Sequence, residues 1–292
     1  MVDKKPKIAV CLFGHLRTYK YCYKFLKENL LDLYDCDVFM HTWSTLSRTQ
    51  KGGRNELISD NSTLKLKDEI IKLYNLKDIL IEEQKNNESE YGIVMSEINT
   101  PLSLFGMHNM FYSNFKANQL REEYQKKYNV QYDYVICTRP DVILYEKFDI
   151  EQQKSGLSQN QLDKAFFCTA GWHPQRRMND AKCAASCNIF YWAKPEIISN
   201  ACNNFNHILE KFIPDMKLER SSESYLLDMI EDLGYQWYFV NYKLGLIREI
   251  PKQLTKLEKH KNNLKQALKQ AAKIPEECLA TAYYYIIGNT RH

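Results

Sequence analysis

Apolar residues in this chain occur either in short continuous runs or at intervals of three and four positions. The run at residues 7–12 predicts a buried strand, and the spacing over residues 19–33 predicts a helix. A second apolar run at residues 36–43 predicts another strand. A strand, a helix and a strand over this short stretch form a βαβ unit, in which the two strands lie parallel.

The same two patterns continue along most of the remaining chain. Further strands are predicted at residues 79–82, 132–138, 165–169, 188–192 and 237–240. Further helices are predicted at residues 63–75, 101–127, 195–212 and 221–233, and a loop at residues 45–62. Strands that alternate with helices indicate an α/β, Rossmann-like fold with a mixed, mostly parallel sheet flanked by helices.

Charge divides the chain into two parts. Residues 252–273 contain seven lysines and one glutamate, whereas the whole chain of 292 residues has a net charge of +4. The rest is therefore close to neutral, which disfavours a nucleic-acid-binding protein. We expect a globular domain at residues 1–250 and a basic helical extension at residues 251–292. The extension is interpreted either as a peripheral contact with an anionic membrane surface, or as a solvated helix face or dimer contact.

The cysteines and the lengths of the apolar runs bear on location. The nine cysteines are an odd number, and the first apolar run is too short for a signal peptide or a membrane span. We therefore expect free thiols in a reducing cytoplasm. Cys183 and Cys187 form a close pair, but no second Cys or His pair follows at the spacing of a zinc site, so no structural zinc is expected.

Arg139 and Asp141 directly follow the predicted strand at residues 132–138. Ligands bind at the carboxyl ends of strands in open α/β sheets. An arginine suits the phosphates of a sugar diphosphate, and an aspartate suits sugar hydroxyls or a hard cation such as Mg²⁺ or Mn²⁺. The alternative is a partly buried ion pair between the two residues.

The first two predicted strands also end in polar residues. Gly14, His15 and Arg17 follow the first strand, where a glycine allows close approach to a ligand and an arginine suits phosphate. The alternative there is a simple tight turn. His41 and Trp43 close the second strand, where they either contact a sugar or base or belong to the core. Three strand ends with polar residues predict one polar cleft.

Three residues farther along the chain carry weaker signals. Asp180 belongs to a polar, basic stretch at residues 172–180, which is either a ligand-binding loop or a solvated one. Glu223 lies in the first turn of a predicted helix, where a carboxylate either complements the helix dipole or acts as a base. Arg248 follows the last predicted strand and is either a phosphate ligand or a surface charge.

Three motifs together resemble a known family. They are IAVCLFGHLRTY at residues 8–19, DVFMHTW at residues 37–43 and YDYVICTRPD at residues 132–141. They resemble motifs of bacterial surface-polysaccharide proteins that are found with lipopolysaccharide and capsule biosynthesis genes. These proteins are regarded as glycosyltransferases of the GT-A type. The resemblance covers about residues 7–250, over which the matching motifs occur in the same order as in the family.

The resemblance implies a donor-binding site made from the three strand ends. The residues that it places around the nucleotide diphosphate are Gly14, His15, Arg17, His41 and Trp43. The segment from Arg139 to Asp141 would stand where GT-A enzymes carry their Asp-x-Asp metal and donor motif. The first aspartate is replaced by arginine here, and an arginine neutralises a diphosphate without a cation. Asp141 is therefore expected either to bind a metal ion or to bind the donor sugar directly.

Later elements of the family match less fully. Asn188 matches the asparagine of an Asn-Asp element whose aspartate is missing here, and Asn179 with Asp180 is an alternative match. The family's acidic residue at the start of a late helix matches Glu223, and its closing Leu-x-Arg matches Arg248. Catalytic roles are thereby expected of Asp141, Glu223 or Asp180, and donor-binding roles of Asn188 and Arg248.

We therefore expect a cytoplasmic glycosyltransferase that moves a sugar from a nucleotide diphosphate donor to a bacterial surface glycan or a lipid-linked glycan. Residues 252–273 would bring the protein to the inner face of the inner membrane. Mn²⁺ or Mg²⁺ is expected only if Asp141 is a metal ligand. The alternatives are a non-catalytic subunit that binds a nucleotide or a glycan, and a phosphotransferase that acts on the same polysaccharides.

Overall fold

The computed structural model describes residues 5–47, 61–84, 104–170, 186–205, 222–240 and 242–247. All of them belong to one compact unit, Met1–Arg248. The predicted extension at residues 251–292 lies outside the described residues, so the division into two domains stays a prediction.

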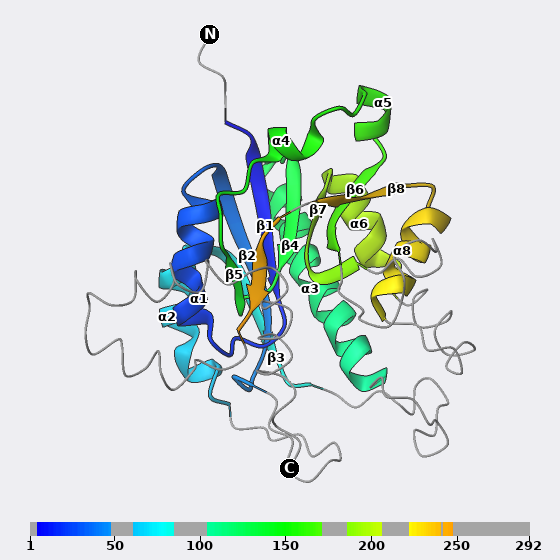
Figure 1. Cartoon of the computed structure of the whole chain (residues 1–292). Coiled ribbons are helices and arrows are strands. Elements are labelled where there is room, and N and C mark those ends of the chain that lie inside the picture. The colour runs from blue at the N-terminus through cyan, green and yellow to red at the C-terminus, as the bar shows by residue number, and fades with distance from the viewer. Residues whose placement is uncertain are drawn as a thin grey trace, which may run out of the picture. The chain divides into compact units, whose positions relative to one another are not determined.

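A seven-stranded sheet forms the centre of this unit, with the strand order β3-β2-β1-β4-β7-β6-β8 (Figure 1). Its strands are β1 (Lys7–Phe13), β2 (Asp35–Trp43), β3 (Leu76–Glu82), β4 (Tyr134–Thr138), β6 (Ala165–Ala170), β7 (Ser186–Ala193) and β8 (Gln236–Val240). β1 is parallel to β2 and β4, β2 to β3, and β6 to β8, whereas β7 runs antiparallel to β4 and β6. The predicted mixed, mostly parallel sheet is confirmed.

The central strands are buried on both faces because their side chains alternate between two hydrophobic cores. In β1, Ala9, Cys11 and Phe13 enter one core, and Ile8 and Val10 enter the other. Residues 8–13 of β1 are therefore all apolar. This double burial explains why β1 appears in the sequence as an unbroken apolar run.

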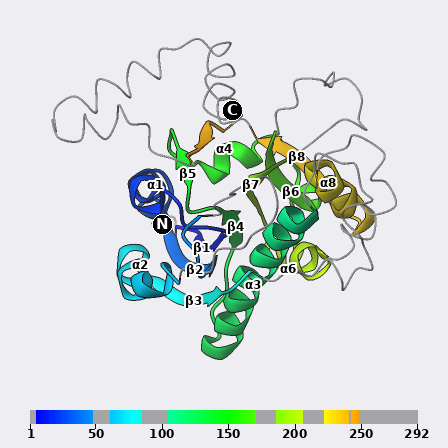
Figure 2. The same ribbon diagram turned by 90° about the horizontal axis from the view of Figure 1, so that it is seen from below.

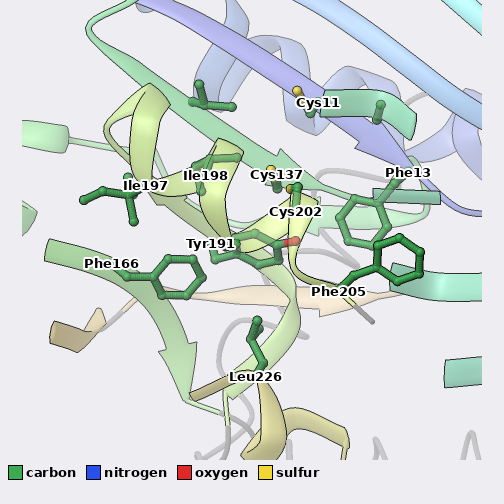
Figure 3. Close-up of a cluster of buried hydrophobic side chains, with 14 of the residues drawn as sticks. Cys11, Phe13, Cys137, Phe166, Tyr191, Ile197, Ile198, Cys202, Phe205 and Leu226 are labelled. Atoms are coloured by element: carbon green, nitrogen blue, oxygen red, sulfur yellow. The ribbon is translucent and has the colours of Figure 1, made fainter. Parts of the chain in front are cut away.

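Helices cover both faces of the sheet (Figure 2). One face carries α1 (Tyr19–Leu26) and α2 (Lys67–Tyr74), and the other carries α3 (Leu104–Tyr128), α6 (Pro195–Asn203) and α8 (Ser222–Asp232). Figure 3 shows the core beneath the second group, where Tyr191 of β7 lies among side chains from β1, β4 and α6. The predicted flanking helices are confirmed. None of the described helices is long and apolar enough to cross a membrane.

Some elements differ from the predictions. The helix predicted at residues 19–33 is α-helical only to Leu26 and continues as a π-helical turn, η1 (Lys27–Leu31). The described part of the helix predicted at residues 195–212 is α6, and residues 206–212 lie outside the description. The helix predicted at residues 63–75 begins with a 3₁₀ turn, η2 (Leu64–Leu66), before α2. The elements that the sequence does not predict are α4 (Ile150–Lys154), α5 (Gln159–Leu162), and the antiparallel pair β5 (Val142–Leu144) and β9 (Leu244–Leu246). Each is too short to show a periodic pattern.

Candidate functional site

The carboxyl ends of β1, β2 and β4 lie side by side at one edge of the sheet. The register pairs Phe13 with His41 and Leu12 with Thr138. The three polar segments that follow or close these strands in the sequence therefore lie together. This is the edge at which open α/β sheets bind their ligands.

Asp141 lies between two arginines at this edge. Its Oδ2 accepts hydrogen bonds from Nη1 of Arg17 and Nη2 of Arg139, each at 2.7 Å, and its Oδ1 accepts one from Nε of Arg139 at 2.9 Å. The Asp141 side chain is completely buried, whereas 17% of the Arg17 side chain and 12% of the Arg139 side chain are exposed. We call these three residues the arginine–aspartate cluster.

The arginine–aspartate cluster carries an excess of one positive charge. Burial by itself would raise the pKa of Asp141, but the charges and hydrogen bonds of Arg139 and Arg17 hold that pKa below its usual value. The carboxylate is therefore ionised at neutral pH and is shared by the two arginines. Two guanidinium groups beside one carboxylate suit an anion such as a phosphate group.

Arg17 has a backbone conformation that is unusual for a residue with a side chain. Its φ is +45°, in the left-handed region, and its N–H donates to the Leu46 carbonyl at 2.8 Å. This conformation costs a non-glycine residue about 1–2 kcal/mol. Backbone strain of this kind is concentrated at functional sites. The nearby Gly14 has a φ of +92°, which a glycine adopts without that cost.

A buried hydrogen-bond chain links this turn to β2, β3 and α3. The Gly14 N–H donates to Oγ of Ser113 at 2.8 Å, and that Oγ lies 2.7 Å from Nδ1 of His41. Nε2 of His41 lies 2.9 Å from Oε2 of Glu82. One proton arrangement satisfies every member, with His41 donating to Glu82, and Ser113 donating to His41 while it accepts from Gly14. The chain therefore fixes the start of the turn that carries Arg17.

His41 and Trp43 lie in the core beside this hydrogen-bond chain. His41 is completely buried, and burial lowers its pKa, so that its ring is neutral at physiological pH. Trp43 is 3% exposed, stacks on Tyr112 with ring centroids 6.1 Å apart, and meets the His41 ring edge-on at 4.8 Å. These positions match the alternative of a core tryptophan with a satisfied histidine. Contact of either ring with a ligand stays a prediction.

His15 is also buried, but only one of its ring nitrogens has a hydrogen-bond partner. Nδ1 lies 3.1 Å from the Thr45 carbonyl, whereas Nε2 has no hydrogen-bond partner among the residues that the structure describes. Burial lowers the pKa of His15 most, the Thr45 hydrogen bond opposes this, and the charges of Arg17 and Arg139 lower it further, to about 4. The ring is therefore neutral at pH 7 and within electrostatic reach of both guanidinium groups.

The other predicted site residues are placed only in part. Asn188 belongs to β7, whose neighbouring residues pair with the ends of β4 and β6, so its backbone lies at the same edge. Glu223 belongs to the first turn of α8, and the side chains of both residues lie outside the description. Asp180 and Arg248 also lie outside it. Ile247, which precedes Arg248, donates its N–H to the backbone carbonyl of Asp141 at 2.8 Å.

A divalent cation does not fit the described residues of this edge. Both oxygens of Asp141 already accept hydrogen bonds from guanidinium groups, and a cation there would face two positive charges. Mn²⁺ and Mg²⁺ prefer several oxygen ligands. Within the described ranges, no group of three or more His, Cys, Asp or Glu side chains could hold a metal ion. Metal binding at Asp141 would require both ion pairs to open.

Ser113, Glu82 and Thr45 contribute to this edge although the sequence analysis does not single them out. Ser113 lies in the middle of a long helix, where no local pattern distinguishes it from other polar residues. Thr45 contributes only a backbone carbonyl. Glu82 is the last residue of the third predicted strand. Polar residues also end the two neighbouring strands, and this shared pattern could have indicated Glu82 as a site residue.

No protein-family model and no curated protein matches this chain. The fold and the edge by themselves define its class: an α/β protein with a basic cluster at the carboxyl ends of parallel strands, organised by one buried carboxylate.

Proposed function

We propose that this chain binds a nucleotide diphosphate sugar at the edge formed by β1 and β4, and transfers the sugar to a glycan acceptor as a GT-A-like glycosyltransferase. The observation that carries the proposal is the arginine–aspartate cluster, because Arg17 and Arg139 come from different strand ends and share one buried carboxylate. The resemblance of the three motifs to bacterial lipopolysaccharide and capsule biosynthesis proteins supports a surface glycan as the acceptor.

Guanidinium groups suit a diphosphate for both geometric and electrostatic reasons. Each is a planar fork of N–H donors that matches two phosphate oxygens, and each stays charged at any physiological pH. Asp141 occupies one side of both guanidinium groups and keeps them from turning away. Side chains that are oriented before the ligand arrives lower the entropic cost of binding.

The same two charges would assist the transfer step. When the bond between the sugar and the diphosphate breaks, negative charge develops on the leaving phosphate oxygen, and fixed positive groups stabilise it. The acceptor hydroxyl also needs a base to take its proton. Glu223 and Asp180 stay the candidates for that base. Asp141 suits the role poorly because its carboxylate is buried and bonded to both arginines.

The acceptor in this proposal is a growing glycan or a lipid-linked glycan. The seven lysines at residues 252–273 would hold the protein at the anionic inner face of the inner membrane. Each lysine near such a surface contributes about 1 kcal/mol of binding free energy. This part of the proposal depends on the sequence of the segment alone.

A second candidate is a non-catalytic subunit that binds a nucleotide or a glycan. The observation that favours it is that Asp141, the carboxylate that follows β4, forms ion pairs with both arginines. Such a subunit would hold the diphosphate through the same arginines without breaking the sugar bond. The two candidates therefore share the binding site and differ in turnover.

Binding is tested with the full-length chain and a panel of UDP-, GDP- and TDP-sugars, first by thermal stability and then by calorimetry. A ligand that binds the native state raises its melting temperature. Arg17→Gln and Arg139→Gln should each weaken the binding of that sugar nucleotide by about 10- to 100-fold, because each removes a charge-assisted hydrogen bond worth about 1.5–3 kcal/mol. Lys20→Gln is the control, because Lys20 lies close to Arg17 in sequence but is 60% exposed and paired with Glu69.

Two results would contradict the proposal. One is the absence of any binding by the panel, and the other is a wild-type affinity in both arginine variants. Turnover then separates the two candidate functions. Slow hydrolysis of the bound donor without an acceptor indicates a transferase, whereas binding without loss of the sugar indicates the non-catalytic subunit.

A further inference from the structure

His15 is a buried side chain with an unused hydrogen-bonding atom. The residue is 6% exposed and lies in the turn between β1 and α1, two positions before Arg17. Its Nε2 atom is buried and has no hydrogen-bond partner within the described part of the chain. Buried polar atoms nearly always have a hydrogen-bond partner in folded proteins. A buried Nε2 without one therefore indicates a partner that comes from a bound molecule.

The hydrogen bond at the other ring nitrogen determines what Nε2 can do. The Thr45 carbonyl, 3.1 Å from Nδ1, can only accept, so Nδ1 must carry the proton. In a neutral imidazole Nε2 is then an acceptor. Burial and the two arginine charges lower the pKa of His15 to about 4, which keeps the ring in this neutral form. The missing partner of Nε2 is therefore a hydrogen-bond donor.

The surroundings narrow the identity of that donor. Arg17 and Arg139 are near enough to the ring for their charges to act on it. The centroid of the Trp43 ring lies 6.5 Å from that of the His15 ring. A ligand whose phosphates lie on the guanidinium groups would therefore bring its next chemical group close to His15. In a nucleotide sugar, the groups next to the diphosphate are the ribose and the transferred sugar, and both carry hydroxyls.

We propose that Nε2 of His15 accepts a hydrogen bond from a hydroxyl of the ligand whose diphosphate Arg17 and Arg139 hold. The inference rests on the proposed function and adds to it a hydroxyl-recognising position. His15 would select ligands that carry a hydroxyl next to the phosphates, because a ligand without one leaves Nε2 buried and unpaired.

Two substitutions at His15 separate its two hydrogen bonds. His15→Asn offers an amide N–H close to the position of Nδ1, which preserves the bond to Thr45, and has nothing at the position of Nε2. His15→Gln reaches the position of Nε2 and offers a carbonyl oxygen there. If the hydroxyl bond exists, His15→Asn loses affinity and His15→Gln recovers part of it. Melting temperatures of both variants show whether each is folded.

The probes form two comparisons, one that removes only the ribose hydroxyls and one that adds the sugar. They are UDP, 2′,3′-dideoxy-UDP and a UDP-sugar, or the corresponding guanosine or thymidine compounds if the panel described above favours those. Binding constants are measured by calorimetry for the wild type and both variants. Loss of a single hydrogen bond to a buried acceptor should cost about tenfold in affinity.

The outcomes distinguish the two sources of the hydroxyl. A ribose hydroxyl is indicated if removal of the ribose hydroxyls weakens binding about tenfold in the wild type and hardly at all in His15→Asn. A sugar hydroxyl is indicated if His15→Asn weakens the UDP-sugar about tenfold and leaves UDP unchanged. Equal weakening of all three probes would overturn the proposal and leave His15 a structural residue of the turn.

Failure of this inference is distinguishable from failure of the proposed function. If the probes bind and the binding depends on Arg17 and Arg139, but the variants of His15 do not discriminate between the probes, only the hydroxyl-recognising position is wrong. If no probe binds to the wild type, both proposals are wrong.

Discussion

The carboxylate of Asp141 accepts a hydrogen bond from Arg17 at 2.7 Å, although the two residues are 124 positions apart in the sequence. Asp141 also accepts two hydrogen bonds from Arg139. One buried carboxylate therefore joins the turn after β1 to the turn after β4. In the proposed function, the arginines would face the ligand and the aspartate would position them.

Loss of the Asp141 charge should destabilise the fold strongly. Asp141→Asn keeps the shape of the side chain but removes the buried negative charge that the two guanidinium groups share. Removal of one partner from a buried ion pair costs about 3–5 kcal/mol, and we expect a loss of this size in the free energy of unfolding, measured by urea denaturation. Asp163→Asn removes an ion pair with Lys194 that lies at the surface, and should change little. Similar effects of the two substitutions would contradict the central role of Asp141.

The backbone strain at Arg17 can be measured by comparing two variants of that residue. Arg17→Gly and Arg17→Ala both remove the guanidinium group, but only glycine adopts a φ of +45° without steric cost. The glycine variant should therefore be more stable than the alanine variant by about 1–2 kcal/mol in urea denaturation. An alanine variant as stable as the glycine variant would show that the turn relaxes and stores no strain.

Ser113 should matter for stability and, through Gly14, for ligand binding. Ser113→Ala removes the partner of the partly buried Gly14 N–H and of the buried Nδ1 of His41, which should cost about 1–3 kcal/mol in the free energy of unfolding. The affinity for the sugar nucleotide should also fall, because the turn that carries Arg17 loses its anchor. The exposed Ser155 supplies the control in Ser155→Ala. An unchanged melting temperature in Ser113→Ala would argue against the hydrogen-bond chain.

His15 should make the fold less stable at mildly acidic pH. Its pKa is about 4 in the folded chain and about 6.5 in the unfolded one. The unfolded chain therefore binds a proton first as the pH falls. The stability that neutral His15 contributes is present above pH 6.5 and is lost between pH 6.5 and 4. Between pH 7 and 5 this loss is about 2 kcal/mol.

The measurement is the difference between the wild type and His15→Gln in urea denaturation at these two pH values. The wild type should lose about 2 kcal/mol more than the variant. Asp141 does not disturb the comparison. Its pKa is lowered in the folded chain, so the stability that its ionised form contributes is lost only at pH values below the usual aspartate pKa. Equal losses in both proteins would mean that His15 is protonated in the folded state at pH 5.

Removal of divalent metal ions should leave ligand binding unchanged. Both oxygens of Asp141 are engaged by arginines, and these supply the positive charge that a cation would otherwise provide. The calorimetric affinity for the sugar nucleotide should agree within about twofold with and without EDTA, a difference well below 1 kcal/mol. A tenfold loss in EDTA, restored by Mn²⁺, would instead assign Asp141 or a neighbouring carboxylate to a metal site.

The sequence predicts the sheet well because its central strands are buried on both faces. Ile8 to Phe13 are apolar without interruption, and this property can be recognised without knowledge of the partners. The short pair β5 and β9 is not predictable in this way. Each strand has three residues. Their pairing joins a segment that precedes β6 in the sequence to one that follows β8. Such pairing depends on tertiary contacts.

The polar residues at the strand ends show a similar division. Their occurrence after apolar runs indicates one edge of the sheet, and the observed registers place these segments together. Whether each of these side chains is buried, and which residues it contacts, could not be predicted. Trp43 is enclosed by His41 and Tyr112, and His41 is satisfied by Ser113 and Glu82, through contacts with elements distant in sequence.

The sequence by itself determined an α/β fold with polar residues at the carboxyl ends of three strands, because apolar periodicity and strand endings are local properties of the chain. Only the tertiary structure decided that Asp141 is a buried counter-charge for Arg17 and Arg139, and that Nε2 of His15 lacks a hydrogen-bond partner in the described ranges. The physical reason is that the burial and pairing of a polar side chain depend on residues from remote segments, which meet only when the sheet assembles.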